Sequence, residues 1–174
     1  MMKFSVRQVF IVFAVFVVAL GILRGAQWVY VRSAVRSPLK QAIIRLHRVS
    51  QVVVNPHESV TVTLTKNANL MSSYEAIQNA SKNVTGHVLT KLVIHNHANA
   101  AMNGLVNSLR LIVAQGEAIG HYVSMNAAIQ RLAQDHHMQA TVQLSNHHIF
   151  VALKSQNHWL DEVMPLKLGG PGDD

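Results

Sequence analysis

An apolar run near the N-terminus constrains this chain more than any other feature. The stretch Val9–Leu23 reads VFIVFAVFVVALGIL and contains no polar side chain. A helix needs about twenty such residues to cross a hydrocarbon core of about 30 Å, and residues 24–31 would supply the missing length. Trp28 and Tyr30 are amphipathic aromatic residues of the kind found at a membrane boundary. The pattern predicts an uncleaved transmembrane signal anchor over residues 8–31.

Two other interpretations of the same run stay open. Residues 1–7 form a short basic tail with Lys3 and Arg7, which is how a cleaved secretory signal begins. The candidate cleavage motif, Ala19-Leu20-Gly21, is poor because a cut there would divide the apolar run. A buried helix of a globular domain is the third possibility, and the lack of a polar face argues against it. The uncleaved anchor is therefore the leading prediction.

Basic residues are concentrated at the N-terminal end of the chain. Eight of the 15 Lys and Arg residues precede Val49 and no Asp or Glu does, whereas the other seven share the rest of the chain with all 8 acidic residues. A protein that binds a nucleic-acid duplex carries its basic surface on the folded domain, so we expect no nucleic-acid partner. Cations that flank an apolar run instead indicate a lipid bilayer as the partner.

Residues 32–57 are predicted to form a basic amphipathic juxtamembrane linker helix. Ser37-Pro38 is a helix start, and apolar residues recur at helical spacing over 39–49. Most cations of this segment lie on the opposite side: Lys40, Arg45 and Arg48. A basic helix of this kind lies on anionic headgroups. The alternative is that the apolar stripe packs against the domain or against a second copy of the chain, so a protein partner or self-association stays open.

The orientation of the predicted anchor is contested within the sequence. The cations that follow the span favour a cytoplasmic C-terminal domain, because loops on that side are enriched in Lys and Arg. In contrast, a basic tail before an apolar run is typical of an export signal, and only 13% of all residues are charged. We therefore expect a single-pass protein of the cell membrane with its C-terminal domain outside the cytoplasm.

Residues 58–166 are predicted to form a small globular domain, and residues 167–174 a flexible tail. The expected strands, read from alternating apolar and polar residues, cover 59–65, 88–95, 138–145, 148–154 and 158–165. Asn146-His147 is expected to be a two-residue turn between the third and fourth of them. The predicted fold class is α+β: a single N-terminal transmembrane helix, then a small domain with a mainly antiparallel sheet of about five strands and three helices.

Three helices are expected between these strands. The first begins at a capping box made by Ser72 and Glu75 and ends at Gly86. The second follows His97 and ends near Gly116, and the third runs from about Tyr122. The short link between the last two predicts a helical hairpin.

Histidine is the only unusual reactive residue type, with 11 copies, and there is no cysteine. The notable pairs are His95 with His97, His136 with His137, and His147 with His148. Adjacent imidazoles project in different directions and do not converge as zinc ligands must. The carboxylates are scattered, and no nucleophile motif, P-loop or dinucleotide fingerprint is present. We expect no catalytic, cofactor-binding or metal-binding residues, no cofactor and no enzymatic activity.

These patterns together predict a membrane-anchored protein whose small extracytoplasmic domain serves protein interaction or assembly at the cell envelope. Two alternatives stay open: a tethered or secreted ligand-binding or hydrolytic domain, and a regulator tethered to the cytoplasmic face of a membrane. A pocket in which His and carboxylate side chains converge would favour the first alternative.

Overall fold

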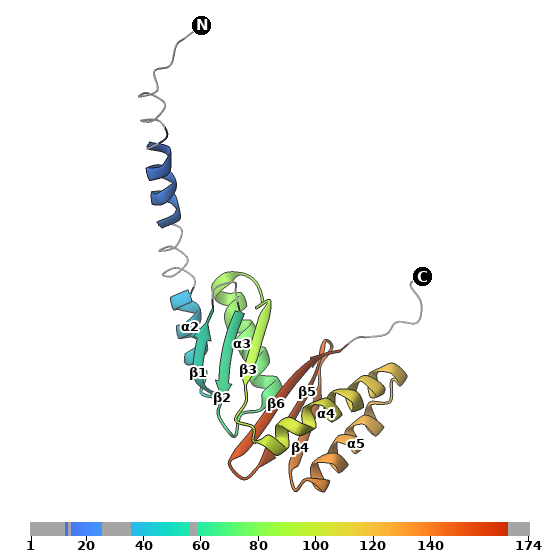
Figure 1. The fold of residues 1–174 in the computed structure, drawn as a ribbon. Helices are drawn as coiled ribbons and strands as arrows, with labels where there is room; N and C mark the ends of the chain where they lie inside the picture. Colours follow the sequence, from blue (N-terminus) through green and yellow to red (C-terminus); the bar gives the residue numbers. More distant parts are fainter. Residues whose placement is uncertain (1–12, 14, 26–35, 56–58, 167–174) are drawn as a thin grey trace, which may run out of the picture.

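The computed structural model describes residues 13, 15–25, 36–55 and 59–166 of the 174-residue chain. After residue 35 the described chain forms two halves, each built on a three-stranded sheet (Figure 1). The first half contains α2 (Ser37–Ile44), β1 (Val49–Val54), β2 (Ser59–Leu64), α3 (Leu70–Thr85) and β3 (Lys91–His95). The second contains α4 (Ala100–Ile119), α5 (Tyr122–Asp135), β4 (Gln139–Leu144), β5 (His148–Ser155) and β6 (His158–Pro165).

Strand β2 is the centre of the first sheet, antiparallel to β1 and parallel to β3. Its sequence SVTVTL alternates, which places Val60, Val62 and Leu64 on one face, and all three are buried. They pack in one cluster with Ile43 of α2 and Ile77 of α3. The two helices therefore cover the apolar face of this sheet, and α3 is the crossover that a parallel β2–β3 pair requires.

The segment predicted as a linker helix is part of this half. The helix ends at Ile44, and Val49–Val54 pairs with β2 as a strand. Leu39 and Ile43 of α2 are buried at 3% and 0% exposure. Of the two roles considered for the apolar stripe, the structure shows packing against the domain.

The N-cap of helix α3 lies three residues before the predicted cap at Ser72. It is Asn69, whose Oδ1 accepts a hydrogen bond from the Ser72 backbone N–H at 2.9 Å, so the capping box of Ser72 and Glu75 is not formed. An asparagine side chain can satisfy an otherwise unpaired amide at this position. Gly86, with φ of 83°, ends the helix in the left-handed conformation, as predicted.

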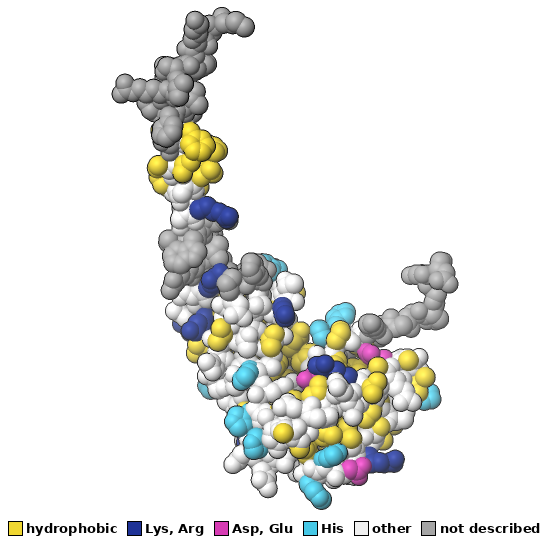
Figure 2. Space-filling view, in the orientation of Figure 1, with side chains coloured by type: hydrophobic (Ala, Val, Ile, Leu, Met, Phe, Trp, Pro, Cys, Tyr) yellow, Lys and Arg dark blue, Asp and Glu magenta, His cyan; other side chains and the backbone are white. Residues whose placement is uncertain are grey.

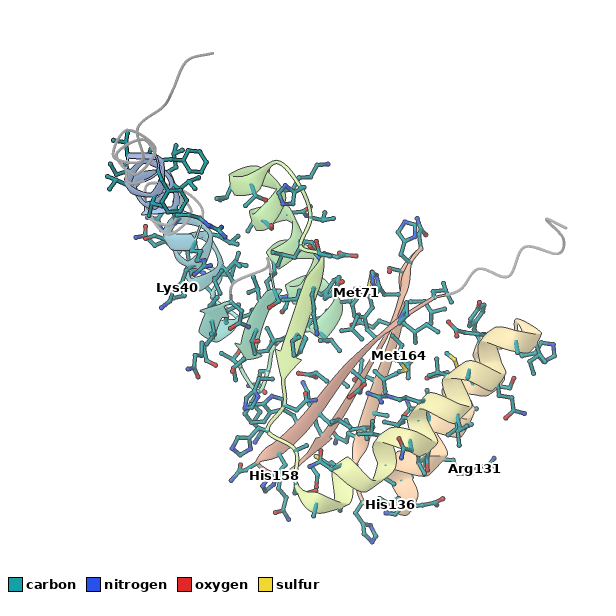
Figure 3. The ribbon with its side chains drawn as sticks, turned by 45° about the horizontal axis from the view of Figure 1, so that its top comes forward. Lys40, Met71, Arg131, His136, His158 and Met164 are labelled. Carbon is teal, nitrogen blue, oxygen red and sulfur yellow. The ribbon has the colours of Figure 1, made fainter. Side chains whose placement is uncertain are left out.

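Strand β5 lies at the centre of the second sheet, and both of its faces are buried. Ile149, Val151 and Leu153 pack against α4 and α5, whereas Phe150 and Ala152 belong to the core of the first half. A strand covered on both faces has a continuous apolar sequence, as IFVAL has at residues 149–153. Because one strand serves two cores, the two halves fold against each other. Figure 3 shows Met71 and Met164 in the central region where they meet.

Hydrogen bonds join the two sheets just after the end of β3. His97 and Trp159 form an antiparallel bridge with N–O distances of 3.1 and 3.2 Å, and the Asp161 N–H donates to Asn96 Oδ1 at 2.7 Å. The α+β class is therefore right, but the single sheet of about five strands is replaced by two sheets of three. Periodicity identifies strands without identifying their partners, which is why this division was missed.

The hairpin of α4 and α5 forms as predicted, with a different end for its first helix. Helix α4 continues past Gly116 to Ile119, and Gly120, with φ of 67°, ends it. Gly116 is instead buried inside the helix, where an added Cβ would lie 2.6 Å from Met125 Cβ. The glycine is therefore required by the close approach of two helices.

A matched pair of glycine substitutions in α4 tests this contact. Gly116→Ala is expected to lower the free energy of unfolding by about 1–3 kcal/mol, because neither Cβ can move without separating the helices. Gly104→Ala meets nothing within 4 Å and is expected to raise the free energy of unfolding by about 0.5–1 kcal/mol through helix propensity. Urea denaturation measures both. Equal shifts of the same sign would show that Gly116 does not mark a tight contact.

The structure corrects the predicted transmembrane signal anchor. Within the described parts of the chain, no helix combines the length and the apolar character needed to cross a membrane. The described helical residues 15–25 rise about 16 Å at about 1.5 Å per residue, roughly half of a hydrocarbon core. Residues 8–12, 14 and 26–31 of the predicted span lie outside the described residues.

Three further predictions depended on that anchor and are corrected with it. They are the single-pass location in the cell membrane, the placement of the domain outside the cytoplasm, and the role in assembly at the cell envelope. The physical reason is the same for all three: the apolar run was the observation that connected this domain to a membrane. The predicted tails at residues 1–7 and 167–174 lie outside the described residues.

Candidate functional site

A pocket of about 360 Å³ lies between α3 and the turn that joins β4 to β5. Its helical wall carries Tyr74, Glu75, Gln78 and Asn79, and its other wall carries Ser145, Asn146, His147, His148 and Phe150. One wall comes from each half of the molecule, so the pocket exists only when the halves are packed together. We refer to it as the Tyr74 pocket.

A chain of hydrogen bonds fixes two polar side chains of the helical wall, Tyr74 and Gln78. Tyr74 and Gln78 are one helical turn apart and therefore share a face of α3. The Leu89 backbone N–H donates to Gln78 Oε1 at 2.8 Å, which leaves the amide nitrogen of Gln78 to donate to Tyr74 Oη at 3.2 Å. Because the tyrosine oxygen accepts this hydrogen bond, its own hydroxyl hydrogen remains available to donate to another group.

The Tyr74 oxygen faces His148 on the opposite wall. Tyr74 Oη lies 3.4 Å from His148 Nε2, a long contact for a hydrogen bond. Burial removes water from the imidazole and, with a smaller repulsion from His147, lowers the pKa of His148 below its ordinary value of 6.5. The lowered pKa favours the neutral imidazole, and in the tautomer whose Nε2 accepts from Tyr74 the ring proton lies on Nδ1.

The turn that carries His148 is held by Ser145. The Ser145 N–H donates to the His148 carbonyl at 2.9 Å, while Ser145 Oγ accepts from the His148 N–H at 3.1 Å. Asn146 and His147 lie between these two residues, as the predicted two-residue turn requires. A serine hydroxyl that bonds its own turn restricts the backbone.

Aromatic packing forms the floor of the pocket. The Phe150 ring is buried and meets the Tyr74 ring edge-on, with centroids 5.4 Å apart. His148 lies 5.1 Å from the Tyr74 ring and 5.9 Å from the Phe150 ring. Edge-to-face contacts of this kind are favourable and directional, so the three rings hold one another in place.

The other histidine pairs noted in the sequence lie away from this pocket. His97 stacks on Trp159 at 4.9 Å between ring centroids and lies 5.4 Å from the ring of His158. His136 and His137 follow the end of α5, and Figure 2 shows histidines scattered over the visible surface. Within the described residues, no group of three or more His, Asp or Glu side chains is arranged to hold a metal ion.

The carboxylates are also dispersed. Glu75 is on the wall of the Tyr74 pocket, and Glu162 forms an ion pair of 3.2 Å with Arg110 of α4. Asp161 is buried on the opposite face of β6, and burial raises its pKa to about 6, partly offset by the positive charge of Lys154. A buried carboxylate with a raised pKa is a candidate general acid, but Asp161 does not line the Tyr74 pocket.

The sequence did not identify Tyr74 and Gln78 as site residues. Tyr74 packs against the core of the first half, which makes it look like an ordinary apolar-face residue of α3. The only local signal for a polar role is the Gln78 amide four residues later on the same helix face. The decisive partners, Leu89 and His148, come from other elements.

The arrangement offers several hydrogen-bonding groups above an aromatic floor, with their orientations set before any ligand arrives. The imidazole Nε2 of His148 faces Tyr74, and Glu75 is the one carboxylate that lines this pocket. The chain matches no protein-family model, no curated protein and no solved structure.

Proposed function

We propose that this protein binds a small neutral molecule with hydroxyl or amide groups in the Tyr74 pocket. The observation that carries the proposal is the chain of hydrogen bonds from Leu89 through Gln78 and Tyr74 to His148. Groups fixed in this way lose little conformational freedom when a ligand binds, so most of their interaction energy remains available for affinity. A pocket with a few convergent polar groups and a residue of shifted pKa is the usual form of a binding site.

The side chains of the pocket favour a neutral ligand over a charged one. No Lys or Arg lines it to pair with an anion, and Glu75 is its one acidic group. Asn79 and Asn146 each supply a donor and an acceptor, as does the Ser145 hydroxyl. Mixed donors and acceptors of this kind match hydroxyl and amide groups.

The conservative variant Tyr74→Phe tests the proposal in the full-length protein. Glucose, glycerol and acetamide serve as probes, and NMR of the backbone amides measures their affinities. At least one probe is expected to shift the amides of Tyr74, Ser145 and His148 saturably, and Tyr74→Phe is expected to weaken that probe about fivefold to tenfold. The reason is the loss of one hydroxyl hydrogen bond, worth about 1 kcal/mol.

Tyr122→Phe is the matched control. It removes the same hydroxyl group from α5, where Tyr122 packs against the core of the second half. Its probe affinity is expected to equal that of the wild type. The proposal fails if no probe causes saturable shifts at these amides, or if the two variants weaken binding equally.

The Tyr74 pocket bears only on small ligands and not on contacts with membranes or other proteins. The predictions of an anionic headgroup surface, a protein partner and self-association stay predictions. We also propose that the protein acts by binding without catalysis, because the Tyr74 pocket brings together no nucleophile with a base and an orienting carboxylate.

A further inference from the structure

A second pocket, of about 270 Å³, lies on the other side of α3. It is bounded by the loop between α2 and β1 and by the early turns of α3. Its polar lining consists of Arg45, His47, Arg48, Ser72 and Ser73. We refer to it as the Arg48 pocket.

The charge of the Arg48 pocket is entirely positive. Arg45 and Arg48 supply the positive charges, and no Asp or Glu lines the pocket. The Arg48 guanidinium donates a hydrogen bond to Ser72 Oγ, which holds its charge beside α3. Arginine presents several N–H donors in one plane, a geometry suited to the oxygens of a phosphate group.

The helix adds to this field. Helix α3 has 16 residues, and its first turn contains no acidic side chain. Aligned peptide dipoles place partial positive charge at the start of a helix, where an anion is stabilised. The helix start alone does not establish a site, since every helix has one.

A buried hydroxyl without a partner is the independent observation. Ser73 borders the pocket and is 3% exposed, and its Oγ has no hydrogen-bond partner within the described structure. Buried hydroxyl groups in folded proteins are nearly always paired, so an unpaired one needs an explanation. An acceptor oxygen of a ligand in this pocket would supply the missing partner.

We propose that the Arg48 pocket binds a phosphate group, through the guanidinium groups of Arg45 and Arg48 and the hydroxyl of Ser73. The group is either inorganic phosphate or the phosphate of a lipid headgroup. Leu46, Val49 and Ala76 complete the wall and exclude water from one side of the group. This site is separate from the Tyr74 pocket. It requires an anionic ligand, whereas the Tyr74 pocket favours a neutral one.

The test uses the full-length protein and three substitutions. Thermal unfolding is followed with sodium phosphate and with sodium chloride at equal ionic strength. Phosphate, but not chloride, is expected to raise the midpoint of wild-type unfolding. Arg45→Gln and Arg48→Gln are each expected to weaken phosphate binding about tenfold or more, because each removes a charge-assisted hydrogen bond.

Ser73→Ala separates a loss of phosphate binding from a general loss of stability. Removing an unpaired buried hydroxyl is expected to keep or raise the midpoint without phosphate, while the increase caused by phosphate becomes smaller. Lys40→Gln is the matched control, because it removes one charge from an exposed position of α2 that does not line the Arg48 pocket (Figure 3). Its response to phosphate is expected to be that of the wild type.

Vesicles distinguish the two sources of the phosphate group. Sedimentation with phosphatidic acid vesicles is compared with phosphatidylcholine vesicles for the same variants. Saturation by inorganic phosphate supports a soluble ligand, whereas binding only to phosphatidic acid that Arg48→Gln abolishes supports a headgroup. The proposal is overturned if neither probe binds, or if Arg45→Gln, Arg48→Gln and Lys40→Gln reduce binding equally.

Discussion

Replacing Phe150 by alanine is expected to lower the free energy of unfolding by about 3–5 kcal/mol. The ring is 1% exposed and packs in the core of the first half, although β5 belongs to the second. Truncation removes its apolar contacts and leaves a cavity that the two sheets cannot close. A typical domain has a total stability of about 5–15 kcal/mol, so this one change affects a large part of it.

Urea denaturation of the full-length protein measures the Phe150→Ala effect. Phe150→Leu keeps most of the volume and is expected to cost less than the alanine variant. Val123→Ala, at a position 87% exposed on α5, serves as the control and is expected to change stability by at most about 0.5 kcal/mol. A Phe150→Ala effect as small as that of Val123→Ala would contradict the packing of the two halves.

Replacing Asp161 by asparagine is expected to stabilise the protein at neutral pH and not in acid. Burial raises the pKa of this carboxyl from 3.8 to about 6, with a smaller opposing effect from Lys154. The folded protein therefore holds a proton between these two values that the unfolded chain has released, and stability falls as the pH rises through this window. Above it, the buried carboxylate costs about 3 kcal/mol at about 1.4 kcal/mol per pKa unit.

The neutral side chain of Asp161→Asn avoids this cost. We expect the free energy of unfolding to rise by up to about 3 kcal/mol above about pH 7 and to be nearly unchanged below about pH 4. The backbone N–H of residue 161 donates to Asn96 Oδ1, and the substitution is expected to leave this bond in place. Asp135→Asn, at the exposed end of α5, removes the same charge and is expected to have little effect. A gain for Asp161→Asn that is independent of pH would show that its carboxylate is not destabilised by burial.

Elements with a clear local pattern were predictable from the sequence. Strand β2 and helix α5 carry regular apolar spacing, and their bounds differ little from those expected. Strand β1 was missed because its pairing is irregular between Val49 and Gln51 and its burial does not alternate. It was therefore interpreted as the end of a linker.

Features that depend on distant partners were not predictable. The role of Gly116 depends on Met125, and the burial of Asp161 depends on the packing of the two halves. The Tyr74 pocket joins residues 74 positions apart, and the Arg48 pocket joins a loop to a helix 24 positions later. Spacing in a sequence reports neighbours along one element and does not report which elements meet.

The apolar run at Val9–Leu23 shows the limit of composition as evidence. Fifteen apolar residues are consistent with a span only if the flanking residues continue the helix in an apolar form. No described helix has that character. The functional question therefore rests on the folded halves and on the two pockets beside α3.

The most direct test of the binding function follows the imidazole nitrogens of His148 in the full-length protein during a titration with acetamide at neutral pH. We expect a neutral ring protonated on Nδ1 before the titration, and saturable shifts of both nitrogens that are weaker in Tyr74→Phe. A cationic ring at the start, or nitrogens that do not respond to acetamide, glucose or glycerol, would contradict this expectation.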